Sequence, residues 1–439
     1  MFPSLRLNIQ RCSHLVIKPG NPGTVQIPPS TFYSSKASKG KDDKKGKMCS
    51  PAKQDKKSDS KVEKGKMCGP SKNMKEKGKV MCGGKTEEGS GEDKGISEYP
   101  RIGINGFGRI GRMVMRIAAE HGCPLEIVAV NDPQMKPEYM AYLLKYDSTH
   151  GRFVSDVEVE GKQLVMEGRK VCTYQEANPK NIPWKDLGVD YVIEASGKNT
   201  TTEKCQGHLD AGARHVVVAA PCKDNCPTFV VGVNLDEYET NMSIVSAASC
   251  ATNALAPLTK VLHDKFGVVE GFMTTVHAIT ASQRILDQAS QKNWRESRGG
   301  LQNMIPTYTG AAAALGKVLP QLQGKMTALS IRVPIPTVSM IDLTVRTKQA
   351  TCLDEITKAM VEASDDSMLG IMDVTSDEIV SSDLIGSHYS VIYDPKASME
   401  LNKNFFKLIA WFDNEYGYTC RVIDLIKFMH AEAKEAENS

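Results

Sequence analysis

The stretch RIGINGFGRIGRMVMRIAAEHG, residues 101–122, decides the fold of this chain. It opens with a short apolar segment, RIGIN (101–105), which is typical of a strand. The apolar residues that follow recur at helical spacing: Ile110, Met113, Val114 and Ile117. Gly106, Gly108 and Gly111 lie at the junction and form a GxGxxG pattern. The stretch therefore predicts a strand, a glycine-rich turn and a helix.

The sequence after this turn strengthens the prediction of a dinucleotide-binding unit. A second apolar segment, LEIVAVND, ends at Asp132. A GxGxxG pattern is informative when it follows a strand, opens a helix and precedes a strand that ends in an acid. The glycines make the turn, admit a pyrophosphate and let the helix approach the strand. We predict that these residues bind the cofactor: Gly106, Phe107, Gly108, Arg109, Ile110, Gly111 and Asp132.

Asp132 also bears on which dinucleotide is bound. A carboxylate at this place accepts hydrogen bonds from an adenosine ribose and repels a 2′-phosphate. Asp132 therefore favours NAD over NADP.

The rest of the chain divides into two kinds of pattern. Near-continuous apolar runs predict strands of a mostly parallel, doubly covered sheet at 189–196, 214–220, 228–233 and 243–248. Longer alternating runs predict a mixed or antiparallel sheet at 269–279, 325–347 and 404–413. A final amphipathic segment, 418–436, predicts a helix that packs on the first domain.

These patterns predict an α/β fold with two domains. The first is a Rossmann NAD-binding domain over 99–248, completed by the C-terminal helix 415–439. The second is an α+β catalytic domain over 249–414. Residues 1–98 are rich in Lys, Gly and Ser and poor in large apolar residues, which predicts a disordered extension.

The charge of the chain is unevenly distributed. Residues 1–99 carry 21 Lys and Arg against 11 Asp and Glu, whereas the remaining residues carry 34 against 41. A basic arm on a mildly acidic body favours an adhesive tail over a specific nucleic-acid-binding protein. No apolar run approaches the roughly 20 residues that span a bilayer.

The cysteines favour a reducing compartment, since the chain has 12 of them and no secretory apolar segment. Cys222 and Cys226 have no matching second pair, so we predict a structural role and no metal site. Three similar units, KGKMCSP (45–51), KGKMCGP (64–70) and KGKVMCGG (77–84), lie in the extension. Thiols on flexible basic arms suit anchoring.

The first 20 residues contain Arg6, Arg11 and Lys18 and no acid. This bias is typical of a mitochondrial transit peptide, although Pro3 argues against one. Mitochondrial import is therefore the alternative to a cytoplasmic location.

One cysteine lies at the start of a predicted helix, where a thiol can act as a nucleophile. In SAASCATNALAPL (246–258), Cys250 stands where a strand-like run ends and a helix-like run begins. Free N–H groups and the helix dipole favour a thiolate there. A thiolate nucleophile needs a base, and His277 in TTVHAIT is the candidate.

Together with the glycine-rich turn, Cys250 and His277 belong to a series of motifs in which the sequence resembles the phosphorylating glyceraldehyde-3-phosphate dehydrogenases. The resemblance runs from about Tyr99 to the C-terminus. The motifs that carry the resemblance are INGFGRIGR, NDP, YDSTHGRF, SAASCATNALAPL, TTVHAITASQ, IPTYTGAAAALGKV, IRVPIPTVS and WFDNEYGYTCRV. The extension resembles Cys-Gly-Pro repeats of structural sperm-tail proteins and the extensions of sperm-specific family members, which favours a cytoskeletal or flagellar anchor.

The resemblance implies specific roles. Cys250 attacks the aldehyde, His277 takes the proton and keeps the thiol ionised beforehand, and Asn414 fixes the nicotinamide. The implied pocket for the substrate's own phosphate contains Arg332, Thr280 and Ser282. The implied pocket for inorganic phosphate contains Ser249, Thr309 and Gly310. The resemblance also implies a homotetramer.

The chain departs from the family pattern around the phosphate acceptor. Ala251 replaces a hydroxyl residue, and Ala313 replaces a lysine. Gln288 and Ala289 depart from the pattern near the adenosine and weaken the argument for NAD over NADP. Two alternatives stay open: a catalytically weakened scaffold anchored by its tail, and a related sugar-phosphate aldehyde dehydrogenase.

Overall fold

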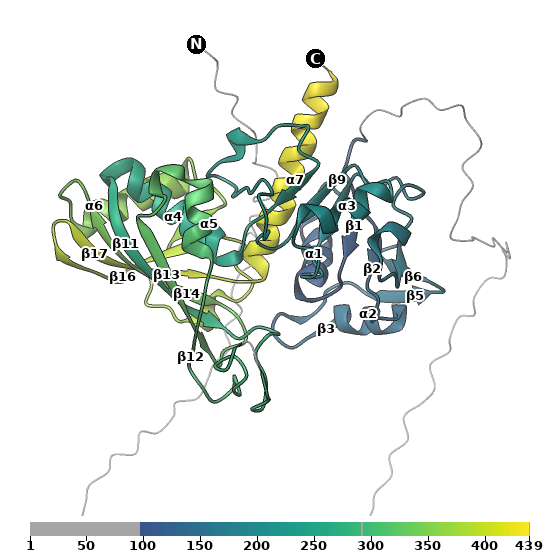
Figure 1. The fold of residues 1–439 in the computed structure, drawn as a ribbon, viewed down its shortest axis with the longest axis horizontal. Coiled ribbons are helices and arrows are strands. Elements are labelled where there is room, and N and C mark those ends of the chain that lie inside the picture. Colours follow the sequence, from purple (N-terminus) through teal and green to yellow (C-terminus); the bar gives the residue numbers. More distant parts are fainter. Residues whose placement is uncertain (1–96, 291–292, 439) are drawn as a thin grey trace, which may run out of the picture. The chain divides into compact units, whose positions relative to one another are not determined.

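The computed structural model describes residues 97–290 and 293–438 of the chain (Figure 1). The predicted disordered extension 1–98, apart from its last two residues, lies outside this described part. The same holds for the three cysteine-containing units and the transit-peptide alternative. Within the described part the chain forms a mixed α/β structure with two large sheets.

The first sheet has eight strands and is mostly parallel, as predicted. In spatial order its strands are β10 (Ile244–Ser246), β9 (His215–Val218), β8 (Tyr191–Glu194), β1 (Arg101–Asn105), β2 (Glu126–Asn131), β7 (Arg169–Tyr174), β6 (Gln163–Met166) and β5 (Val157–Glu160). Neighbouring strands are parallel from β10 through β9, β8, β1 and β2 to β7. Strand β6 pairs antiparallel with both β7 and β5. Its associated helices are α1 (Arg109–Glu120), α2 (Pro137–Lys145) and α3 (Thr202–Asp210). A small hairpin pairs β3 (Tyr146–Asp147) with β4 (Gly151–Arg152).

The strand predicted at 228–233 is wrong. Only Thr228 makes a bridge, to Ser246, and the segment continues as a turn. The Asn234 side chain accepts a hydrogen bond from Val230 N at 2.9 Å and donates to Thr228 O at 3.0 Å. Asn234 thus satisfies backbone groups that a neighbouring strand would otherwise pair. The run is apolar because Phe229, Val230 and Val231 are buried in the core.

The second sheet has seven strands and is mixed, as predicted. In spatial order its strands are β12 (Ile305–Thr307), β13 (Met326–Val333), β11 (Val268–Ala278), β14 (Ser339–Thr347), β17 (Phe405–Phe412), β16 (Val391–Asn402) and β15 (Met372–Val374). Pairs β11·β13 and β15·β16 are parallel, and the others are antiparallel. The predicted run 325–347 divides into two strands at 334–338, where two prolines lack a donor N–H.

Three helices pack against this second sheet (Figure 1). They are α4 (Cys250–Phe266), α5 (Ala311–Val318) and α6 (Leu353–Asp365). Helix α4 contacts strands β11, β14, β16 and β17 and also helix α5. These contacts place the beginning of α4, with its cysteine, next to the sheet that carries His277.

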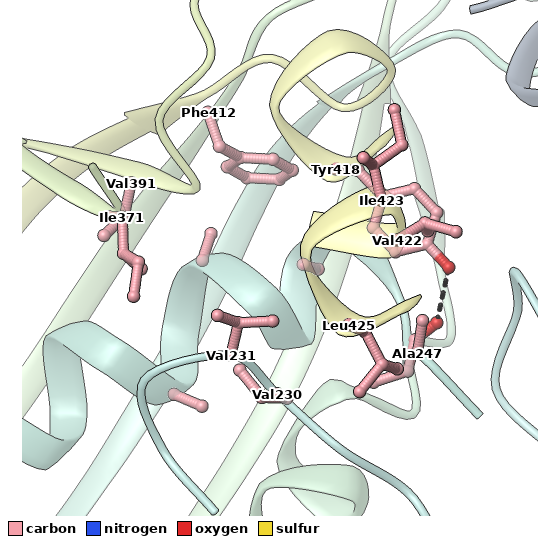
Figure 2. Packing of buried hydrophobic residues seen from close by; sticks show 14 of the residues in the cluster. Val230, Val231, Ala247, Ile371, Val391, Phe412, Tyr418, Val422, Ile423 and Leu425 are labelled. Carbon is pink, nitrogen blue, oxygen red and sulfur yellow. Dashed lines mark hydrogen bonds between the residues drawn. The ribbon is translucent and has the colours of Figure 1, made fainter. Parts of the chain in front are cut away.

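The last helix, α7 (Tyr416–Glu437), covers the predicted segment and contacts both α1 and α4. Its predicted apolar face is buried: Val422, Leu425, Ile426 and Met429. Figure 2 shows residues of this helix, Tyr418, Val422, Ile423 and Leu425, within the same hydrophobic cluster as Val230 and Val231. Tyr418 Oη donates to Ala248 O at 3.0 Å, so the helix also supports the turn before Cys250.

A buried polar cluster joins α1 to the segments before and within the start of α7. Arg109 pairs with Asp147 and with Glu415. His150 Nε2 lies 3.3 Å from Asp413 Oδ2, and its Nδ1 lies 3.5 Å from Glu415 Oε2. The side chains of His150 and Asp413 are 5% and 0% exposed, so these charges compensate one another out of water.

This cluster predicts a pH-dependent stability. Burial lowers the pKa of His150, but hydrogen bonds to Asp147 and Asp413 and the charges of Asp413 and Glu415 outweigh it, raising the pKa to about 9. A folded-state pKa above the unfolded value gives stability that is complete below about pH 6.5 and is lost as pH rises through about 9. The loss is of the order of 2–3 kcal/mol.

The measurement is the urea unfolding midpoint at pH 6.5 and pH 9.5 for the wild type and for His150→Gln. The unfolding midpoint of the variant should be lower than that of the wild type at pH 6.5. It should also fall less than the wild-type midpoint on going to pH 9.5. An equal loss in both proteins would show that another group titrates.

Candidate active site

Cys250 is the first residue of helix α4, directly after the turn that leaves β10. Ser249 caps the helix, because its hydroxyl accepts a hydrogen bond from Thr252 N at 3.1 Å. Ala248 adopts a positive φ of 55°, a conformation that costs free energy for a residue with a Cβ. Ser246 Oγ accepts from Ala248 N at 3.1 Å and helps to hold this turn. The sequence therefore presents the thiol at a helix N-terminus, as predicted.

His277 lies at the end of β11 and faces this thiol. Its Nε2 is 3.8 Å from Cys250 Sγ. Its Nδ1 lies 2.7 Å from Ala278 O. Because a carbonyl only accepts hydrogen bonds, Nδ1 must carry the proton. In the neutral imidazole the lone pair is therefore on Nε2 and directed toward the thiol, which is the arrangement of a base beside a nucleophile.

The protonation states of the pair follow from burial. Burial raises the pKa of the Cys250 thiol to about 11, although Arg332 and the N–H groups of Ala251 and Cys250 act in the opposite direction. Burial and the positive charge of Arg332 lower the pKa of His277 to about 4. Burial therefore favours a neutral thiol beside a neutral imidazole. The proton then leaves as the sulfur attacks, and Nε2 is in place to accept it.

Arg332 lies beside this pair on β13, where its backbone is in register with His277 of β11. Its Nε and Nη1 atoms are buried and have no hydrogen-bond partner among the residues the structure describes. Two buried guanidinium nitrogens without partners are costly. An anionic group of a substrate would satisfy it through charge-assisted hydrogen bonds.

The other residues predicted for the substrate phosphate lie in the loop after β11. Thr280 Oγ1 is 2.8 Å from Ser282 Oγ, and it also donates to Gln283 Oε1 at 2.9 Å. The two hydroxyls are therefore brought together. The structure records no hydrogen bond between either of them and Arg332.

The residues predicted for inorganic phosphate lie at two helix starts. Ser249 caps α4, Gly310 precedes α5, and Thr309 Oγ1 accepts from Ala311 N at 3.3 Å. Helices α4 and α5 contact each other, and helix N-termini favour anions. Ala251 lies buried at the first of these starts.

Sequence reasoning missed Glu296, which lies near this region. Its carboxylate accepts a hydrogen bond from Thr307 Oγ1 of β12. Burial lowers the pKa of Arg332, and the charges that Cys250 and Glu296 carry when ionised oppose that shift. Glu296 is thus an acid within electrostatic reach of the unpartnered guanidinium. Its surroundings in the sequence, WRESRG, carry no pattern that singles it out.

The glycine-rich turn fits a bound dinucleotide. Gly106 has φ +98°, and a Cβ there would lie 2.5 Å from Ser196 N. A Cβ on Gly111 would lie 2.1 Å from Gly106 O, so only glycine lets α1 approach the turn. A Cβ on Gly108 would meet nothing within 4 Å, which leaves open space on the side where a pyrophosphate is expected.

Asp132 ties the end of β2 to this turn. Its Oδ2 accepts from Phe107 N at 3.0 Å and its Oδ1 from Gln134 N at 2.9 Å. Each carboxylate oxygen can accept a further hydrogen bond, as a ribose hydroxyl would require. Of the other predicted residues, the Phe107 side chain is fully buried and the Arg109 side chain is held by acids. These two can therefore serve a dinucleotide mainly through the backbone.

Asn414 follows β17 and is held by two hydroxyls. Its Oδ1 accepts from Thr337 Oγ1 and from Ser339 Oγ, both at 3.3 Å. The carbonyl side of the amide is thus occupied, and the NH₂ side is left to donate to a ligand. The neighbours Asp413 and Glu415 belong to the buried polar cluster, which fixes the backbone on both sides of Asn414.

The described residues, 97–290 and 293–438, lack two further features. They contain no helix long and apolar enough to cross a membrane. They also contain no group of three or more His, Cys, Asp or Glu that could hold a metal ion.

Comparison with known proteins places the chain in a family. Residues 100–202 match the profile "Glyceraldehyde 3-phosphate dehydrogenase, NAD binding domain", and residues 249–414 match the profile "Glyceraldehyde 3-phosphate dehydrogenase, C-terminal domain".

Among curated proteins, the glyceraldehyde-3-phosphate dehydrogenase of Cochliobolus lunatus is 51% identical over 329 residues, which cover 75% of this chain and 97% of that protein. The protein of the same name from Glossina morsitans morsitans is 52% identical over 332 residues, 76% of this chain and 99% of that protein. The protein of the same name from Neurospora crassa is 50% identical over 337 residues, which cover 76% of this chain and 99% of that protein. This chain belongs to the glyceraldehyde-3-phosphate dehydrogenase family.

Proposed function

We propose that the chain is an NAD-dependent phosphorylating aldehyde dehydrogenase. It oxidises D-glyceraldehyde 3-phosphate and phosphorylates the product to 1,3-bisphosphoglycerate in glycolysis. The observation that carries the proposal is the Cys250–His277 pair, with Sγ and Nε2 3.8 Å apart and the tautomer fixed by Ala278. The unpartnered Arg332 beside it supplies the charge that a phosphorylated substrate needs.

The chemistry is divided between the thiol and the imidazole. Cys250 Sγ forms a bond to the aldehyde carbon, and the thiol proton passes to His277 Nε2. His277 Nε2 then returns this proton to the carbonyl oxygen, which becomes the hydroxyl of a thiohemiacetal and leaves the imidazole neutral again. Bound NAD supplies the acceptor for the hydride. His277 takes the hydroxyl proton as the thiohemiacetal is oxidised to a thioester. Inorganic phosphate then attacks the thioester carbon, and the bond to Cys250 breaks.

The remaining residues hold the reactants. Arg332, Thr280 and Ser282 bind the substrate's own phosphate, and Ser249, Thr309 and Gly310 bind inorganic phosphate. The backbone of the glycine-rich turn and Asp132 hold the adenosine and pyrophosphate of NAD. The Asn414 NH₂ donates to the nicotinamide carboxamide. The domain division at 99–248 and 249–414, with 415–439 completing the first domain, belongs to this proposal.

Assembly and location are part of the proposal. A homotetramer is supported by large exposed apolar side chains in and near the loop 283–304, including Ile285, Leu286 and Trp294 at 71%, 69% and 79% exposure. A second copy of the chain would cover them. A cytoplasmic location is supported by the numerous thiols. The basic, cysteine-containing extension favours attachment to a flagellar or cytoskeletal structure, with mitochondrial import as the alternative.

The test of the activity is NADH formation from a panel of aldehydes, with and without inorganic phosphate. Turnover with glyceraldehyde 3-phosphate that needs phosphate supports the proposal. Faster turnover with erythrose 4-phosphate would identify the related sugar-phosphate dehydrogenase. Binding of NAD without turnover of either aldehyde would identify the scaffold. NADP in place of NAD tests the weakening of cofactor preference at Gln288 and Ala289.

The replacement at position 251 predicts weak use of inorganic phosphate. A hydroxyl there would donate to the attacking phosphate, and a hydrogen bond to a charged group contributes roughly 1.5–3 kcal/mol. Ala251→Thr should therefore lower KM for phosphate by about ten-fold or more. Ala251→Thr with Ala313→Lys should lower it further. Affinity for NAD should change little, which serves as the control. Superimposable phosphate saturation curves would show that other groups compensate.

The extension predicts a modular chain. Residues 97–438 contain both hydrophobic clusters of the described fold, so a chain that begins at 97 should remain soluble and bind NAD. The measurement is NAD binding and sedimentation of the truncated protein beside the full chain. Aggregation or loss of NAD binding on truncation would contradict the prediction. Loss of cell localisation without loss of activity would support the anchor.

A further inference from the structure

A second pair of reactive side chains lies outside the proposed active site. Cys222 and Cys226 are in the loop between β9 and the buried segment 228–233, and both are free thiols. Their side chains are hydrogen-bonded to each other. The dehydrogenase chemistry uses neither of them. We propose that Cys222 and Cys226 form a modification site at which a peroxide converts the two thiols into a disulfide.

The two thiols differ in a way that suits this reaction. Cys222 is half-buried, whereas Cys226 is 3% exposed. The hydrogen bond from Cys226 lowers the pKa of Cys222, with Ser246 and Lys317 adding to the effect against burial and the charge of Asp224. The same hydrogen bond and burial raise the pKa of Cys226. The more exposed and more acidic thiol is the expected nucleophile, and the buried one is the expected resolving group.

Contacts around the pair hold the sulfur atoms in place. Cys226 Sγ lies 3.6 Å from both Pro227 O and Ile244 O. Cys222 is hydrogen-bonded to Ser246 of the same strand, β10. Both cysteines are therefore anchored to one edge strand of the first sheet. The two residues are joined by a three-residue loop that includes Asp224, and a disulfide requires their sulfurs to meet at about 2.05 Å.

A cavity beside the loop reaches Cys226, whereas a small oxidant reaches Cys222 through the exposed part of its own side chain. The cavity has a volume of about 330 Å³ and is lined by residues 225–229, which include Cys226, and by Glu237, Met242 and Lys317. Lys317 Nζ donates to Asp224 O at 3.4 Å, which places its positive charge at the loop between the two cysteines. A positive charge favours the thiolate form of Cys222.

The reaction balances with hydrogen peroxide as the oxidant. The Cys222 thiolate attacks one peroxide oxygen, the O–O bond breaks, and the departing hydroxide takes up a proton to become water. Cys226 sulfur then attacks Cys222 sulfur, the S–O bond breaks, and the hydroxide leaves with the Cys226 proton as a second water. Two thiols are oxidised and one peroxide is reduced.

The test follows the new bond by mass spectrometry of the full chain. Trypsin cleaves after Lys223, between the two cysteines, so a disulfide joins peptide 215–223 to peptide 224–260. The second peptide also contains Cys250. The variants must therefore distinguish a disulfide between Cys222 and Cys226 from one between Cys222 and Cys250. After graded peroxide and alkylation of the remaining thiols, the wild type and Cys250→Ser should both give the joined peptides. Cys226→Ala and Cys222→Ser should give none, and a reductant should separate the peptides.

Two results would overturn the proposal. One is the absence of the joined peptides at every peroxide concentration. The other is their presence in Cys226→Ala with their loss in Cys250→Ser, because Cys222 would then pair with Cys250. If Cys226→Ala does not fold, Cys250→Ser still decides between the pairings, because it keeps the joined peptides only when Cys222 pairs with Cys226. The measurement does not depend on turnover, so it stands apart from the test of the dehydrogenase activity.

Discussion

Cys250→Ser should abolish oxidation of glyceraldehyde 3-phosphate, with kcat falling by about four orders of magnitude or more. Serine keeps the size of the side chain and the helix start, so folding and NAD binding should change little. The hydroxyl is a far weaker acid than the thiol, so His277 removes its proton far less readily. The measurement is steady-state NADH formation together with a direct titration of NAD binding.

Cys352→Ser is the matched control for this variant. Cys352 is half-buried at the N-cap of α6, far from the proposed chemistry, and serine is a favourable N-cap residue. It should leave kcat unchanged. Near-normal turnover of Cys250→Ser would show that another residue is the nucleophile.

His277→Asn should slow the reaction by about 10²–10⁴-fold, which is the range of general acid–base catalysis. The asparagine amide cannot accept the proton that leaves as Cys250 attacks, nor the one that leaves as the thiohemiacetal is oxidised. Alkylation of Cys250 near pH 7 should also slow, because the acceptor for the thiol proton, 3.8 Å from Sγ, is lost. The measurements are kcat and the pH dependence of alkylation by iodoacetamide.

A histidine outside the site provides the control. His263 Nδ1 accepts from Val268 N at 3.1 Å at the end of α4, so His263→Asn affects the same helix without touching the pair. Its kcat should stay within a few-fold of the wild type. If His277→Asn and His263→Asn lose activity to the same extent, the loss reflects folding and the role of His277 as base is wrong.

Local sequence signals predicted much of the fold. The spacing in 101–122 predicted β1, the turn and α1, because each is determined by residues close in the chain. The start of α4 at Cys250 was also predicted, since Ser249 is a favourable capping residue. The alternating runs predicted β11 and β17, each within about one residue of its observed ends.

Other features depend on contacts between distant segments and left no local signal. The run 228–233 is apolar because it is buried, and the Asn234 side chain decides that it is a turn. Arg109 meets Glu415 across 306 residues of sequence. The distance between Cys250 and His277, and the proton on Nδ1, required the structure. The helix start and His277 could be weighed from the sequence, whereas the opposing effect of burial on the pKa of Cys250 required the structure.

The most direct measurement of the central claim is a single turnover in the absence of phosphate. Enzyme, NAD and glyceraldehyde 3-phosphate are mixed, NADH is followed, and the protein is analysed by mass spectrometry. The account predicts a burst of about one NADH per active site, an acyl group on the peptide that contains Cys250, and release of that group when phosphate is added. A phosphate-independent steady rate with no burst, or an acyl group on another residue, would contradict it.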